Sequence, residues 1–344
     1  MRDGAGAIGN GRNSPRNPLV IWLVGLGALA TFAASLLLGP AHITPADLVR
    51  GLLDSHARDA AAARTLFWDL RLPRALLAAV TGAALAISGA LLQAYFQNPM
   101  AGPYVIGVSS GAGLGVAIVV ALAGAAGPRG ASIPVAALVG GLAVVGLVAA
   151  IARRSRSART ETLLLLGLAI AAVCSAITSV LLLLLPRGPE GVLFWLMGSI
   201  AGATWGGVGL VGAGLAAGLV FGLWCARDLD AILWGDETAR SVGVDVARTR
   251  GLLLIAATIP AAASVSSCGV IGFLGLMVPH LAREVVGAEH RRLVPLSAVI
   301  GAGWLLLADL LARLILAPAE LPVGAITSAV GAPFLAWICL RRRR

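Results

Sequence analysis

Residues 75–128 read ALLAAVTGAALAISGALLQAYFQNPMAGPYVIGVSSGAGLGVAIVVALAGAAGP, which is 54 consecutive positions without a charged side chain. A transmembrane helix needs about 20 apolar residues. The stretch is therefore long enough for two membrane-spanning helices. The polar residues Gln97, Asn98 and Pro99 fit the turn between them. This stretch predicts a membrane protein built from helices.

The whole chain has the same character. Of its 344 residues 58% are apolar and only 12% are charged, and the mean hydropathy is +0.92. A soluble domain has about 25% charged residues, so this chain has too little polar surface to face water on all sides. The composition excludes a soluble enzyme and predicts an all-α membrane protein.

The other charge-poor stretches bring the expected number of transmembrane helices to ten. The stretch 17–46 could be a signal peptide, but its apolar run is long and no A-x-A site follows it, so a first span is favoured. The stretch 251–282 fits one full span followed by a short or broken one. The others supply one span each, with room for a short extra helix around Phe194–Met197; they are 130–152, 162–186, 191–226, 293–317 and 321–340.

The basic residues predict the orientation. All 26 are arginine, and with a cytoplasmic N-terminus 18 of them fall on the inner side, as the positive-inside rule requires. Both termini are then cytoplasmic. We expect residues 1–17 to be a disordered tail and residues 18–344 to be a single transmembrane domain. Without lysine there is no P-loop lysine, so the chain cannot hydrolyse ATP by the Walker route.

Eight arginines fall on the outer side instead. Arg71 and Arg74 stand where the second span begins, and Arg313 follows Asp309 by one helical turn inside an apolar helix. One interpretation is that the side chains snorkel to the membrane surface, with a local ion pair between Asp309 and Arg313. The other is a basic outer rim that docks an acidic partner.

The predicted spans contain few residues that could bind ions or transfer protons inside the membrane. Apart from Asp309, Arg313 and His280, the spans carry few ionisable groups, and His280 fits a helix-end residue better than a ligand. No HExxH motif or pair of membrane aspartates suggests an enzyme. The four cysteines lie far apart, so neither a metal site nor a disulfide is indicated. A proton-driven transporter would carry more ionisable groups, which favours an external motor.

Two segments share a spacing. Ser88-Gly89 precedes Asn98-Pro99 as Cys268-Gly269 precedes Pro279-His280, with ten residues from glycine to proline in both. By the span count these segments cross the membrane in opposite directions. That arrangement is expected of an inverted repeat, which is common in transporters.

The inner connection 226–250, ARDLDAILWGDETARSVGVDVARTR, predicts two short helices. Asp230 is expected to cap the first and Asp236 the second, with Gly235 between them and Gly243 at the end. The connection could be an amphipathic loop on the membrane surface. It could also be a compact knob that passes force to a partner.

Several longer motifs resemble one known family. They are RLPRALLAAVTGAALAISGALLQ (71–93), QNPMAGPYVIGVSSGAGLG (97–115), FWLMGS (194–199), WGDETARSVGV (234–244), GVIGFLGLMVPHLAR (269–283) and ADLLARLILAPAELPVGAITSAVGAPF (308–334). From about residue 66 to 340 the chain resembles the permease subunits of ATP-binding-cassette (ABC) importers for iron-siderophores, haem and cobalamin.

The resemblance implies the type II ABC importer permease fold in the bacterial inner membrane, and transport by alternating access. It implies a second permease subunit (the same chain or a paralogue), two cytoplasmic ATPase subunits and an extracytoplasmic substrate-binding protein. It implies no cofactor, metal or nucleic acid. The substrate stays open among the three classes, with siderophores favoured as the commonest. A stand-alone secondary transporter is the alternative.

The resemblance also assigns roles to residues. ATPase coupling is expected at Asp230, Leu233, Trp234, Gly235, Asp236, Glu237, Ala239 and Gly243, and binding-protein docking at Arg71, Arg74 and Arg313. The pathway and its gate are expected at Gln93, Asn98, Pro99, Ser109, Ser110, Gly111, Thr160, Glu161, Pro279 and His280. Glu161 departs from the small hydroxyl residues that the family's gate would have.

Overall fold

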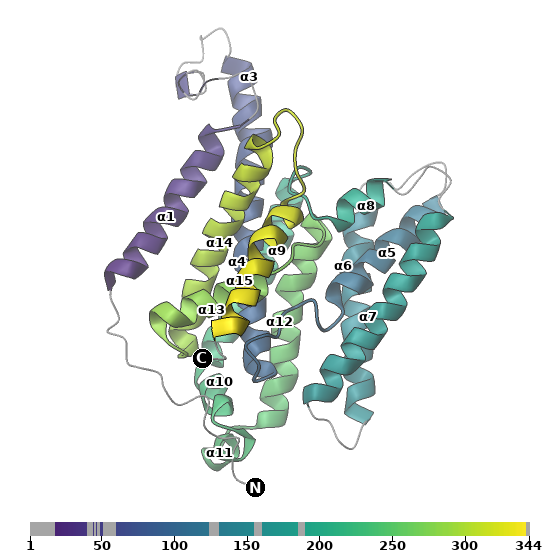
Figure 1. Cartoon of the computed structure of the whole chain (residues 1–344), viewed down its shortest axis with the longest axis vertical. Helices are drawn as coiled ribbons and strands as arrows, with labels where there is room; N and C mark the ends of the chain where they lie inside the picture. The colour runs from purple at the N-terminus through teal and green to yellow at the C-terminus, as the bar shows by residue number, and fades with distance from the viewer. Residues whose placement is uncertain are drawn as a thin grey trace.

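The computed structural model describes residues 18–39, 44, 46, 49–50, 60–123, 131–154, 160–184 and 190–341. The expected tail, 1–17, lies outside the described residues. Within the described part every regular element is a helix (Figure 1), so the prediction of an all-α protein is confirmed.

The long helices follow the charge-poor stretches. They are α1 (Pro18–Leu37), α4 (Leu72–Tyr95), α5 (Val108–Ala123), α6 (Ser132–Arg154), α7 (Thr160–Leu183), α9 (Trp205–Trp224), α12 (Val246–Cys268), α14 (His290–Leu314) and α15 (Val323–Arg341). Shorter helices are α3 (Ala60–Thr65), the π-helix η1 (Leu66–Arg71) that runs into α4, α8 (Glu190–Leu196), α10 (Ala226–Leu233), α11 (Asp236–Ser241) and α13 (Leu274–Val286).

Seven helices in the described part are long and apolar enough to cross a membrane, and α5 and α15 are shorter apolar helices. The stretch 251–282 divides into the full-length α12 and the short α13, as expected. The short extra helix of the 191–226 stretch is α8. A count of ten crossings stays a prediction.

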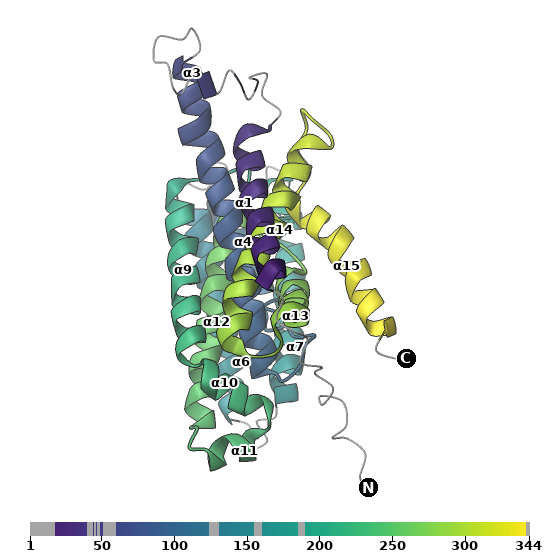
Figure 2. The same ribbon diagram turned by 90° about the vertical axis from the view of Figure 1, so that its left-hand side faces the viewer.

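Helix α4 lies at the centre of the fold and is buried for most of its length. Helices α9, α12, α13 and α14 pack around it, α5 to α7 form a group joined through α12, and α1 lies on α14. Figure 2 shows α15 leaning away from the other helices. Small residues permit close packing without a hydrophobic driving force between helices. At the crossing of α4 and α14, a Cβ atom on Gly82 would lie 2.1 Å from the carbonyl oxygen of Gly301.

The spacing shared by two segments does not correspond to a shared structure. Gly89 lies within α4, whereas Gly269 follows the end of α12 with a φ of +69°. Pro99 lies in the turn after α4, whereas Pro279 is inside α13. The spacing therefore gives no support to an inverted repeat, because the paired residues occupy different backbone settings.

Candidate functional site

Helices α10 and α11, with the first residues of α12, form the knob, which we define as residues 226–250. The knob lies at one end of the molecule, the lower end in Figure 1, where α11 is the lowest helix. Gly235 separates the two helices with a φ of +108°, and Gly243 follows α11 with a φ of +88°. The prediction of two short helices divided and ended by glycine is confirmed.

The predicted capping roles of the two aspartates are wrong. Asp230 lies within α10, and Asp236 is the first residue of α11 with no side-chain cap bond at that helix end. Each carboxylate has a more distant partner instead. Asp236 pairs with Arg250 at 2.8 Å inside the knob, and Asp230 pairs with His290 at the start of α14. The two carboxylates thus bind residues that the tertiary structure brings close, in place of the local backbone N–H groups.

The knob has a small apolar core and an exposed apolar tip. Ile232, Ala239 and Val246 are buried against one another. Trp234 is 81% exposed and Val242 is 67% exposed. Large apolar side chains exposed among the polar residues of a packed knob are typical of a surface that binds another protein.

The remaining predicted coupling residues lie around this tip. Leu233 and Gly235 are partly exposed, Glu237 is exposed, and Ala239 is in the apolar core. Hydrogen bonds to two residues outside it, Gln97 and His290, tie the knob to the long helices. Gln97, just after α4, donates from Nε2 to the carbonyl oxygen of Ile232, and Asp230 accepts from the backbone N–H of His290. Gln97 and His290 were not among the residues predicted for this region.

A charge cluster lies at the opposite end of the molecule, where α4 begins and α14 ends. Its centre is Asp309, which has no exposed surface. Arg74 donates to the Asp309 carboxylate from Nε at 3.0 Å and from Nη2 at 2.9 Å. Arg313 contacts the second carboxylate oxygen at 3.1 Å, which confirms the local ion pair expected from the sequence. One buried carboxylate is thus shared by two guanidinium groups.

Two further contacts extend the cluster. Arg74 also binds Glu320, in the segment after α14, through both carboxylate oxygens at 2.9 and 3.0 Å. Arg313 donates from Nη2 to the Ser35 hydroxyl at 2.8 Å, and Arg71 donates from Nη1 to the carbonyl oxygens of Leu36 and Leu37. These bonds attach the end of α1 to α4 and α14.

The three predicted docking arginines therefore all have partners within the chain. Arg71 and Arg313 are 4% and 3% exposed, whereas the Arg74 side chain is 13% exposed and that of Glu320 31%. Arg74 and Glu320 together form the accessible edge of the cluster. The sequence gives no sign of the Arg74 pairs, because its partners follow it by 235 and 246 positions.

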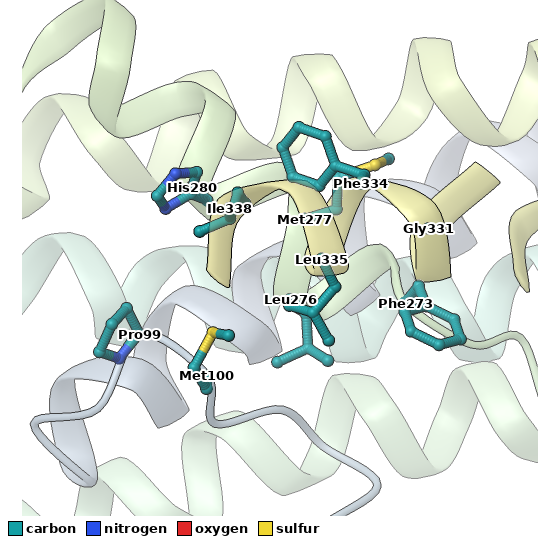
Figure 3. Close-up of a pocket in the computed structure, with 10 residues that line it drawn as sticks. All are labelled: Pro99, Met100, Phe273, Leu276, Met277, His280, Gly331, Phe334, Leu335 and Ile338. Carbon is teal, nitrogen blue, oxygen red and sulfur yellow. The ribbon is translucent and has the colours of Figure 1, made fainter. Parts of the chain in front are cut away.

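Two of the predicted pathway residues share one groove. Pro99 and His280 line a pocket between α13, α15 and the turn after α4, together with aromatic and aliphatic side chains such as Phe273 and Phe334 (Figure 3). An adjoining groove of about 370 Å³ continues past His280 to Glu284, Trp337 and Arg341. The walls are mostly apolar, with charged groups at one end.

The other predicted pathway residues lie in helix packing. Gln93 is buried and donates to the carbonyl oxygens of Gly275 and Leu276, and its own oxygen accepts from Arg283. Asn98 accepts from the backbone of Met100 and shapes the turn. The rest are Gly111, which faces Gly140 of α6; Ser110, which bonds to Gly107; Ser109, whose hydroxyl oxygen is buried; and the buried Pro279. The side chains of Thr160 and Glu161 lie outside the described residues. The pathway set stays a prediction.

Three cysteines, Cys174, Cys225 and Cys268, are free and buried, as expected of small packing residues. Burial raises the pKa of the Cys225 thiol at the start of the knob, and the negative charge of Asp228 adds to this effect. A raised thiol pKa leaves little of the reactive thiolate. Among the described residues no group of three His, Cys, Asp or Glu side chains could hold a metal ion.

Comparison with known proteins supplies the family. Residues 27–341 match the FecCD transport family. The chain belongs to the FecCD transport family. This FecCD chain is an all-α, multi-pass membrane protein with the fold of ABC importer permeases.

Relatives of this chain are named for hemin and cobalamin transport. This FecCD chain is 38% identical to the hemin transport system permease protein HmuU of Yersinia pestis over 97% of its own length and 98% of the relative's. It is 42% identical to the cobalamin import system permease protein BtuC of Halobacterium salinarum, covering 80% of this chain and 73% of the relative. A solved structure described as an inward-facing conformation of a metal-chelate type ABC transporter has 28% identity and a TM-score of 0.80, covering 94% of this chain and 99% of that one.

Proposed function

We propose that the chain is the membrane-spanning permease subunit of an ABC importer that brings a metal chelate (a ferric siderophore, haem or cobalamin) across the bacterial inner membrane by alternating access. The observation that carries the proposal is the knob, in which Trp234 and Val242 are exposed beside a packed apolar core. The similarity to relatives named as hemin and cobalamin permeases supports the substrate class.

The partners follow from this role. Two chains of this kind, or one chain with a paralogue, would surround the pathway, and two cytoplasmic ATPase subunits would each bind one knob. Coupling would act through the tip around Trp234 and Glu237. With 26 arginines and no lysine, the chain has no P-loop lysine of its own. ATP hydrolysis would therefore belong to the partner subunits.

A substrate-binding protein would dock at the charge cluster. Arg74 has the accessible guanidinium edge, so we assign it the direct contact with an acidic partner. Arg71 and Arg313 are buried and would support Arg74 by fixing α1 and Asp309. Pathway and gate roles of the predicted residues stay part of the same proposal, with Pro99 and His280 at the groove of Figure 3.

Reconstitution tests the proposal. Purified chain in liposomes, with its partner ATPase and binding protein, is expected to take up one of the three chelates only when MgATP is present on the knob side. Trp234→Ala is expected to abolish this uptake by weakening ATPase binding. Trp224→Ala, which removes a tryptophan that is 73% exposed at the end of α9, serves as the matched control. Uptake driven by an ion gradient without the ATPase would establish the secondary transporter instead.

A further inference from the structure

The knob contacts α14 through two hydrogen bonds between one carboxylate and one residue. One oxygen of Asp230 lies 3.0 Å from the backbone nitrogen of His290 and 2.6 Å from its ring Nδ1. His290 is the first residue of α14 and has no exposed surface. Its other ring nitrogen is buried without a hydrogen-bond partner in the described part of the chain. Asp230 thus fixes both the backbone and the ring of the residue that begins α14.

We propose that the Asp230–His290 contact is the joint through which the knob moves α14, and that His290 is a positioning residue for coupling. The inference rests on the proposed function and deepens it. It assigns to His290 the transmission of knob movement into the long helices. The ATPase-binding tip at Trp234 and Glu237 would then receive the force, and the joint would pass it on.

The surroundings of α14 suit this task. The helix has 25 residues, a length of about 37 Å at 1.5 Å per residue. It runs from His290 at the joint to Asp309 and Arg313 in the charge cluster. Pro295 removes one backbone hydrogen bond from its first turns. Leu293 and Leu296 on either side of that proline are packed against Ala282 and Val286 of α13, so the beginning of the helix is held.

The crossing of α14 with α4 extends the effect of the joint. A Cβ atom on Gly301 would lie 2.4 Å from the carbonyl oxygen of Gly82, so the two backbones touch. Close-packed interfaces resist small sliding movements. The ion pairs of Asp309 with Arg74 and Arg313 hold the far ends together as well. Movement at His290 would therefore displace α4 and α14 as one unit and reach the docking end.

Parallel measurements of ATP hydrolysis and uptake test the joint in the reconstituted importer. His290→Ala and Asp230→Ala are expected to lower uptake per ATP hydrolysed at least tenfold, with hydrolysis within twofold of wild type. His290→Asn and Asp230→Asn keep a donor or an acceptor at the same place and are expected to stay within threefold of wild type. Arg292→Ala is the control, because Arg292 forms an exposed pair with Glu289 on the same turn.

Several outcomes would overturn the proposal that the Asp230–His290 contact transmits knob movement to α14. Unchanged uptake per ATP in both alanine variants would do so, as would equal losses of hydrolysis and uptake, since a residue that only maintains the fold gives that result. If the wild-type chain shows no ATP-dependent uptake, the proposed function fails. If the wild-type chain shows ATP-dependent uptake and the alanine variants do too, only the role of His290 fails.

A cross-link decides the matter if the alanine variants do not insert. In a chain without its native cysteines, Asp230→Cys and His290→Cys would be joined by a short bismaleimide. The joint predicts that uptake per ATP is low before cross-linking, because the two native side chains are missing, and rises after it, because the covalent bridge restores the connection. Uptake per ATP that is the same before and after complete cross-linking would overturn the inference.

Discussion

At the scale of single residues, Asp309 determines the geometry of the charge cluster. Burying a carboxylate is costly unless it is paired and hydrogen-bonded. Arg74 and Arg313 meet this requirement together, since Arg74 binds both carboxylate oxygens and Arg313 binds Oδ2. Removing the carboxylate would leave two guanidinium groups in an apolar setting with fewer partners.

Asp309→Ala is therefore expected to destabilise the protein strongly. Breaking a buried ion pair by removing one partner costs about 3–5 kcal/mol. Thermal unfolding in detergent measures the change. Glu320→Gln is the comparison, because exposed pairs contribute about 0–1 kcal/mol and the Glu320 side chain is 31% exposed. Equal destabilisation by the two variants would contradict the central role of Asp309.

Glu320 is also expected to affect the proposed docking of a substrate-binding protein. It occupies the edge of Arg74 that an acidic partner would approach. Glu320→Ala is expected to tighten binding of the substrate-binding protein up to about fivefold, since an exposed ion pair of at most about 1 kcal/mol is released. Surface plasmon resonance on the reconstituted chain measures the affinity. Glu190→Ala, which also removes one carboxylate, should leave it unchanged; an equal gain there would indicate only a general charge effect.

At the scale of elements, helix lengths were predictable because a membrane span needs a fixed run of apolar residues. The full-length α12 followed by the short α13 is one example. The caps of α10 and α11 were not predictable. Asp230 and Asp236 have the local spacing of cap residues, yet their charges pair with His290 and Arg250, which only the tertiary structure brings close.

The close crossing of α4 and α14 depends on glycines, which have no side chain. Gly82→Ala is expected to lower the unfolding temperature and uptake, because the added methyl group would lie 2.1 Å from the backbone oxygen of Gly301. Gly212→Ala in α9 is the control. Nothing lies within 4 Å of its Cβ position, and alanine favours a helix over glycine by up to about 1 kcal/mol. Similar unfolding temperatures for the two variants would show that the helices separate at little cost.

At the scale of the whole molecule, the knob and the charge cluster lie at opposite ends, with α4 and α14 between them (Figure 1). The arginine distribution predicts that the knob end is cytoplasmic. Cysteine placed at Glu237 is then expected to react with a membrane-impermeant maleimide only after the cells are permeabilised. Cysteine at Glu320 should react in intact spheroplasts. The reverse labelling pattern would show that the knob faces the outside of the cell and would exclude ATPase binding there.

Part of the candidate site was predictable from the sequence. The position of the knob and its glycine boundaries were predictable, because both are local features of residues 226–250. The local Asp309–Arg313 pair was predictable for the same reason. The partners of Arg74, and the attachment of the knob through Gln97 and His290, join residues far apart in the chain. A single sequence carries no spacing signal for such pairs.

The Arg74–Asp309 pair also has a consequence for how the protein is made. Arg74 leaves the ribosome 235 residues before Asp309, a delay of about 10–50 s at about 5–20 residues per second. During that interval its charge must be solvated by water or lipid headgroups at the membrane surface. Helix α4 can take its final depth only when α14 arrives. The nearly complete chain must therefore be present before its most buried helix is secured.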